Sequence, residues 1–172
     1  MSNFALVFFP KIANDALDDF REKYDPEHKR IAPHITLLYP LPEIAMADLM
    51  NHLQTISSST NSFPIKIGGL KKMDDCLFLL VEEGNEKIIT LKDHLSSGIL
   101  SSYIPAHFPF TPDLTIGYFR SLYDEIDTQS FENAHNEAKE FNFMFSCQLD
   151  SIALLEGDES NTKILQTFAL VK

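Results

Sequence analysis

Several features that define common protein classes are scarce in this chain of 172 residues. It has two cysteines, Cys76 and Cys147, which lack the spacing of a metal or redox motif and are interpreted as reduced core thiols. No apolar run has the length of a membrane helix, and residues 1–10 lack the basic start of a signal peptide. We therefore expect a cytoplasmic protein without membrane contacts, and one that folds at this length without disulfides or metal ions.

Positive charge is also scarce. Lysine and arginine number 14 against 25 aspartates and glutamates, which gives a net charge of −11. Such a protein repels polyphosphates at long range, so extended nucleic-acid binding is not expected, whereas a small phosphorylated ligand or an RNA end in one local pocket is compatible. Glycine-rich phosphate loops are missing, and no two histidines have the spacing of metal ligands, so we expect neither a cofactor nor a metal.

Hydrophobic periodicity predicts an alternation of strands and helices. Helical stripes are expected within residues 13–20, 46–56, 88–99 and 131–138. Strands are expected at residues 3–9, 35–39, 63–67, 76–81, 114–119, 143–149, 151–155 and 164–171. Residues 57–62 are expected to form a linker, and residues 68–69 and 74–75 to form turns. The consecutive strands at the end of the chain favour an α+β fold over a doubly wound parallel sheet.

One short motif occurs twice, about half a chain length apart. Residues 33–37 and residues 112–116 both read proline, polar residue, aliphatic, threonine, aliphatic. Because alternate residues of a strand project to the same side, His34 and Thr36 should project together, and so should Asp113 and Thr115. Two such strands related by a pseudo-twofold axis would direct all four polar side chains into one cleft.

These residue types suit a phosphate ester. Threonine hydroxyls donate hydrogen bonds to the non-bridging oxygens of phosphate, and histidine titrates near neutrality, so it serves as an acid or a base. In an isolated copy of the motif, the histidine would more often merely cap a turn at the end of a strand. The second copy shifts the interpretation toward a site built around His34.

On these motifs the sequence resembles the 2H phosphoesterase superfamily, which includes the bacterial 2′-5′ RNA ligase-like proteins and short bacterial phosphoesterases. The resemblance covers essentially the whole chain, with further markers at residues 5–10, 24–26, 110–117 and 166–170. It implies a single α+β domain over residues 1–172, with two pseudo-symmetric lobes, each an antiparallel sheet packed on helices, around a central cleft. It also implies hydrolysis of 2′,3′-cyclic phosphates or related esters without metal, in which His34 is catalytic and Thr36 and Thr115 hold the phosphate.

The second motif departs from the family pattern, because Asp113 stands where a histidine is expected. In the RNA ligase-like relatives the first histidine is usually assigned as the proton donor and the second as the acceptor. An ionised aspartate can accept a proton but repels a phosphate, and it could act as an acid only if burial raised its pKa. We therefore expect Asp113 to be a catalytic residue of weakened or altered activity, with loss of turnover as the alternative.

Four further residues are candidates for lining the cleft. Tyr39 and Tyr118 follow the two motifs in matching places and would stack on a base at the cleft mouth, although core packing is the alternative for at least one of them. His107 precedes the second motif in a loop, and Arg120 follows it. For both of these, simple surface exposure is the alternative.

Three functions are compatible with these residues. The first is a metal-independent 2H-type phosphodiesterase, and the second is a binding module that keeps the phosphate pocket without turnover. The third is a cleft that binds an unrelated ligand, which the presence of His34, Thr36 and Thr115 together disfavours. We expect a monomer in each case.

Overall fold

The computed structural model describes residues 3–104, 110–120, 125–157 and 161–172. Its strands are β1 (Asn3–Phe8), β2 (Ile35–Leu38), β3 (Phe63–Met73), β4 (Cys76–Glu83), β5 (Asp113–Tyr118), β6 (Phe145–Leu149), β7 (Ser151–Gly157) and β8 (Thr162–Ala169). In this described part of the chain they form one sheet in the order β6-β3-β4-β5-β2-β1-β7-β8, with antiparallel neighbours throughout. The predicted α+β class is confirmed, and the two expected sheets join edge to edge through β5 and β2.

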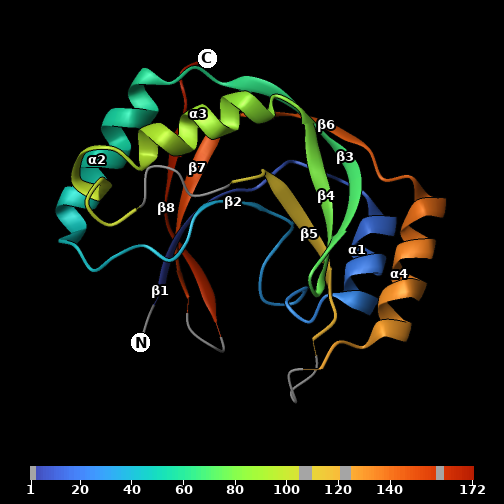
Figure 1. Cartoon of the computed structure of the whole chain (residues 1–172). Helices are drawn as coiled ribbons and strands as arrows, with labels where there is room; N and C mark the ends of the chain where they lie inside the picture. Colours follow the sequence, from blue (N-terminus) through green and yellow to red (C-terminus); the bar gives the residue numbers. More distant parts are fainter. Residues whose placement is uncertain (1–2, 105–109, 121–124, 158–160) are drawn as a thin grey trace.

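The helices α1 (Asp15–Tyr24), α2 (Met46–Ser59), α3 (Asn85–Leu95) and α4 (Thr128–Phe141) lie outside the curled sheet (Figure 1). Helices α2 and α3 contact each other and cover the half that contains β2 and β8, whereas α1 and α4 cover the half that contains β5 and β3. Helix α1 follows β1 in the chain but packs against β5, so the chain crosses between the halves. No helix in the described ranges is long and apolar enough to span a membrane.

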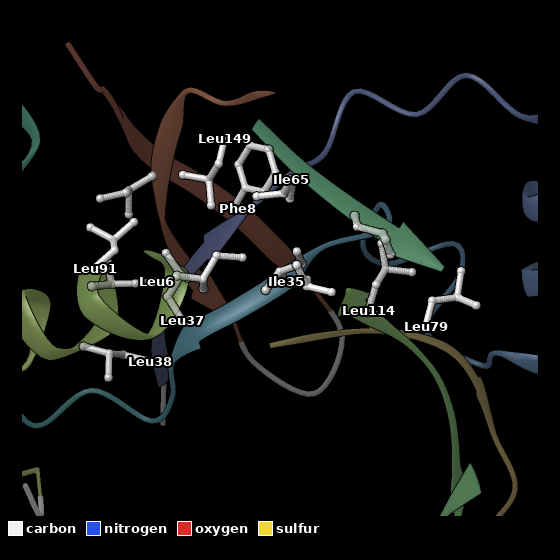
Figure 2. Close-up of a cluster of buried hydrophobic side chains, with 14 of the residues drawn as sticks. Leu6, Phe8, Ile35, Leu37, Leu38, Ile65, Leu79, Leu91, Leu114 and Leu149 are labelled. Atoms are coloured by element: carbon white, nitrogen blue, oxygen red, sulfur yellow. The ribbon is translucent and has the colours of Figure 1, made fainter. Parts of the chain in front are cut away.

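The main core lies between the helices and the convex face of the sheet. Figure 2 shows side chains of the sheet and of α3 meeting there, and they are almost completely buried: Leu6, Phe8, Ile35, Leu37, Leu79, Leu91 and Leu114. Because side chains alternate along a strand, the residues between these core positions project toward the concave face. That face carries a separate small apolar cluster of Val7, Ala153 and Leu155.

The predicted turn at Gly68 and Gly69 is wrong, because both glycines lie inside β3. The pairing of β3 with β4 passes from Ile67 opposite Val81 to Gly69 opposite Leu80, so Gly68 is the extra residue of a β-bulge. The second predicted turn, at residues 74–75, is confirmed, and Asp74 has the positive φ of 52° that such a tight reversal requires.

Two predicted boundaries are also wrong. The linker expected at residues 57–62 starts too early, because α2 continues to Ser59. The hydroxyls of Ser57 and Thr60 donate to the carbonyls of Gln54 and Ile56 at 3.1 and 2.8 Å, so these polar residues extend the end of the helix. Helix α3 ends at Leu95, and Ile99 lies beyond it with 40% of its surface exposed rather than on the buried stripe.

Candidate active site

The two repeated motifs meet where β2 and β5 pair. Ile35 registers with Leu114, and both side chains are fully buried in the main core. Continuing this antiparallel register places His34 opposite Thr115 and Thr36 opposite Asp113, all four on the concave face. Side chains directly opposite lie about 5 Å apart and diagonal ones about 7–8 Å apart, so the polar residues of the two motifs gather at one place.

His34 has a fixed ring orientation. Its Nδ1 lies 3.0 Å from the carbonyl oxygen of Ala32, and its ring lies 6.0 Å from that of Phe9. A carbonyl only accepts hydrogen bonds, so Nδ1 donates, and the neutral imidazole keeps its lone pair on Nε2. Burial lowers the pKa of His34 below its ordinary value of 6.5, and the hydrogen bond to Ala32 opposes this effect only in part.

Asp113 is half-buried on the same face. Burial raises the pKa of its carboxyl group to about 6, and the positive charge of Lys71 on β3 opposes this shift. The two titratable groups of the motifs are therefore shifted toward each other, the histidine downward and the aspartate upward. Both shifts have the same main cause, because burial disfavours the charged form of each group.

A cavity of about 460 Å³ opens beside the motifs and is lined by His34, Thr36 and Thr115. A volume of this size is within the usual range for small-molecule sites. Asp113 does not line this cavity, although the register places it diagonally across from His34.

Of the four remaining candidate residues, two line the cavity, one lies outside it and one is not among the described residues. Tyr39 and Tyr118 both line the cavity, with 61% and 39% of their surfaces exposed, so neither is a core residue. Arg120 lies outside this cavity, and its Nε donates to Asp75 Oδ2 at 2.5 Å. It lines a second cavity of about 360 Å³, and Tyr118 lines both cavities. His107 lies outside the described residues. No cluster of His, Cys, Asp or Glu that could hold a metal ion occurs among the residues that are described.

Sequence reasoning missed a buried ion pair beside the cavity. Arg21 has 2% of its surface exposed, and its Nε and Nη2 donate to Asp25 Oδ2 at 3.0 and 2.8 Å. Nη2 also donates to the carbonyl oxygen of Ile31 at 3.0 Å, and Asp25 Oδ1 accepts from the backbone of Glu27 at 2.9 Å. The pair thereby ties the end of α1 to the loop that leads into His34.

A signal for this pair does exist in the sequence. Arg21 follows Phe20 on the predicted apolar stripe of the first helix, and Asp25 is four residues further along, which is the spacing of a helical ion pair. Periodicity alone does not tell whether such an arginine is buried. The pair also affects the motif histidine. The charge of Arg21 lowers the pKa of His34, and the charge of Asp25 raises it.

Known proteins match this chain along most of its length. The family described as the 2′-5′ RNA ligase superfamily matches residues 8–161. A protein of Bacillus cereus strain B4264 named "Putative phosphoesterase" is 29% identical over 174 residues, covering 97% of this chain and 96% of that protein. TT0787 of Thermus thermophilus has the same fold, with a TM-score of 0.65 at 16% identity over 98% of this chain and 97% of that chain. Escherichia coli LigT complexed with 3′-AMP also shares it, with a TM-score of 0.57 at 15% identity over 99% of both chains.

Proposed function

Since this chain belongs to the 2′-5′ RNA ligase superfamily, a branch of the 2H phosphoesterases, we propose that it is a metal-independent phosphodiesterase. Its substrate is a 2′,3′-cyclic phosphate or a related ester of a nucleotide or an RNA end. The observation that carries the proposal is that His34, Thr36 and Thr115, from two distant motifs, line one cavity. Crystal structures of LigT with 3′-AMP and with phosphate support a phosphate-bearing ligand for this fold.

Each motif residue has a role that its chemistry allows. The hydroxyls of Thr36 and Thr115 donate to the non-bridging phosphate oxygens. Asp113 accepts the proton of the attacking water while the water oxygen bonds to phosphorus. The bond from phosphorus to one ribose oxygen breaks, and that oxygen takes a proton from Nε2 of the protonated His34. Because Nδ1 is held by Ala32, Nε2 is the nitrogen available for this transfer.

The proposed reaction needs an ionised Asp113 and a protonated His34 at the same time. Burial raises the pKa of Asp113 to about 6 and lowers that of His34 below 6.5. The two requirements overlap only in the mildly acidic range. At pH 8 the imidazole has lost its proton, and at pH 4 the carboxylate has gained one, so the rate falls on both sides.

The second candidate function is a phosphate-binding module without turnover. It is favoured by the position of Asp113, which carries a negative charge at neutral pH and does not line the cavity. A misplaced or missing acid–base group lowers rates by about 10²–10⁴. A pocket that keeps His34 and both threonines would still bind the phosphate group.

The two functions are separated by assaying hydrolysis of 2′,3′-cyclic nucleotides and binding of 3′-AMP by the same protein. A phosphodiesterase shows turnover that His34→Ala reduces by at least about 10²-fold. The matched control is His94→Ala, since His94 is an exposed histidine on α3, and it should retain full activity. Binding of 3′-AMP without turnover in the wild type supports the binding module. If neither turnover nor binding is found, both functions are wrong.

Thr115→Val tests the phosphate contact in the same assays. Valine has nearly the shape of threonine but no hydroxyl, so affinity for 3′-AMP should fall about 5- to 10-fold for the loss of one hydrogen bond. Thr90→Val is the control, because Thr90 is exposed on α3, where its hydroxyl donates only to the carbonyl of Glu86. An unchanged affinity in Thr115→Val would show that the phosphate does not bind between the motifs.

A further inference from the structure

A phosphate group in the cavity beside the motifs has to be bound by a protein whose net charge is −11. The carboxylate of Asp113 lies on the same face and adds repulsion once it is ionised. The hydroxyls of Thr36 and Thr115 donate hydrogen bonds but carry no charge. Among the described residues that line the cavity, two are arginines, Arg21 and Arg30. Because guanidinium groups form charge-assisted hydrogen bonds with phosphate oxygens, these two side chains are the candidates for offsetting the charge.

Arg21 is already engaged within the protein. Its side chain is 2% exposed, and its Nε and Nη2 both donate to Asp25 Oδ2. Nη2 also donates to the carbonyl oxygen of Ile31. Turning this guanidinium toward a ligand would leave Asp25 buried and charged without its partner, which is strongly destabilising. The charge of Arg21 is therefore balanced by Asp25 whether or not a ligand is bound.

Arg30 makes a weaker contact in the turn that precedes His34. Its Nε lies 2.5 Å from Glu27 Oε2, and the two side chains are 35% and 45% exposed. Although close, the contact is not aligned as a hydrogen bond, and Glu27 Oε2 is shielded from solvent without a hydrogen-bond partner in the described part of the chain. Exposed ion pairs of this kind contribute little to stability. An incoming anion can therefore replace the carboxylate at low cost.

The turn that carries Arg30 is anchored beside the motif threonines. Ile31 packs against the small apolar cluster of the concave face, to which Val7 belongs, and Val7 registers with Thr36 on β2. Arg30 directly precedes Ile31 and lines the same cavity as Thr36. Glu27 lines this cavity as well, so its carboxylate already places one anion there. Rotation about side-chain bonds is enough to move the guanidinium from Glu27 to a phosphate.

We propose that Arg30 is the phosphate-binding cation of this cavity, and that Glu27 holds its guanidinium until the phosphate of the ligand displaces the carboxylate. No covalent bond changes in this exchange, because one oxyanion replaces another beside the same cation. The inference rests on the proposed phosphodiesterase site. It adds that the protein contains an internal anion, the carboxylate of Glu27, that competes with the ligand.

The test measures binding of 3′-AMP by calorimetry at low ionic strength and neutral pH. Arg30→Gln should raise the Kd at least about tenfold, because a charge-assisted hydrogen bond is lost, and Arg30→Lys should recover part of the affinity. Glu27→Gln should lower the Kd about 2- to 5-fold, because the competing ion pair is removed. This gain should be absent when Glu27→Gln is combined with Arg30→Gln, since it acts through the arginine.

The neighbouring ion pair of Lys29 with Glu22 provides the matched controls. Its Nζ and Oε1 lie 3.7 Å apart, the side chains are 84% and 59% exposed, and neither residue lines the cavity beside the motifs. Lys29→Gln and Glu22→Gln remove the same charges as the two test substitutions, so they report the effect of net charge alone. Each should change the Kd by less than about twofold, because exposed charges away from the ligand are screened.

The results separate the inference from the proposed function. If Arg30→Gln weakens binding no more than Lys29→Gln does, Arg30 does not bind the phosphate, while hydrolysis of 2′,3′-cyclic AMP by the wild type would leave the phosphodiesterase intact. If Glu27→Gln fails to strengthen binding, or strengthens it equally without Arg30, the exchange is wrong. A wild type that neither binds 3′-AMP nor hydrolyses the cyclic nucleotide overturns the phosphate site and the inference together. Thermal unfolding of each variant confirms that it is folded.

Discussion

Asp113→Asn should stabilise the protein, and the gain should depend on pH. Burial raises the pKa of this carboxyl from the ordinary 3.8 to about 6. Between these values the folded protein binds a proton that the unfolded chain has released, so stability falls as the pH rises through this window. Above the window, the ionised and buried carboxylate destabilises the protein by about 3 kcal/mol, because each pH unit between the two values costs about 1.4 kcal/mol. Asparagine has the same shape and no charge to bury.

The magnitude follows from that window. At pH 8, Asp113→Asn should raise the free energy of unfolding by up to about 3 kcal/mol. For a chain of this length the melting temperature should rise by roughly 6–12 °C. At pH 4, where the carboxyl is largely protonated in the folded protein, the two proteins should differ little.

Urea unfolding of both proteins at pH 4, 6 and 8 measures this difference directly. The matched control is Asp19→Asn, since Asp19 is an exposed aspartate on α1, and its small effect should not follow the same window. A stability difference that is equal at pH 4 and pH 8 would refute the reasoning, because it would arise from packing rather than from ionisation. A destabilised variant at pH 8 would show that the carboxylate has a favourable partner.

The remaining predictions concern activity and the buried ion pair. Asp113→His should raise cyclic phosphodiesterase activity at pH 7.5 by at least about tenfold, because it removes a negative charge from beside the phosphate and supplies a group that titrates near neutrality; equal or lower activity in the folded variant would count against this. The pH–rate profile of the wild type should reach its maximum on the acidic side of neutrality and fall toward pH 8, because burial lowers the pKa of His34, and a flat profile from pH 5 to 8 would contradict the proposed proton transfers. Activity should persist in EDTA, since the acid and base are side chains, and loss with recovery on adding a metal would oppose it. Arg21→Met should lower the free energy of unfolding by about 3–5 kcal/mol in urea denaturation, because Asp25 is left buried and charged, and Arg21→Met with Asp25→Leu should restore part of it.

Local patterns were sufficient to predict most elements of the fold. The helical stripes and the alternation along the strands depend on which side chains face the core, and that information is contained in each segment. One error occurred where tertiary pairing overrides local preference. Gly68 and Gly69 favour a turn by composition, but the pairing of β3 with β4 on both sides of the bulge keeps them within β3.

The candidate site, like the fold, could be predicted in part from the sequence. The alternation of His34 with Ile35 and Thr36, and of Asp113 with Leu114 and Thr115, is determined by the sequence, because a strand with one apolar face must direct its polar residues to the other. The repeat of the motif was equally sufficient to suggest that the two strands belong to one site.

Only the tertiary structure decided how these residues are coupled to their surroundings. The pairing of Ile35 with Leu114 sets which polar residues are neighbours, and burial in the assembled sheet sets the pKa of Asp113. The hydrogen bond from Arg21 to the carbonyl oxygen of Ile31, by which the ion pair supports the His34 loop, is likewise seen only in the structure. Burial and register depend on contacts between distant segments, and for that physical reason neither can be read from the motifs themselves.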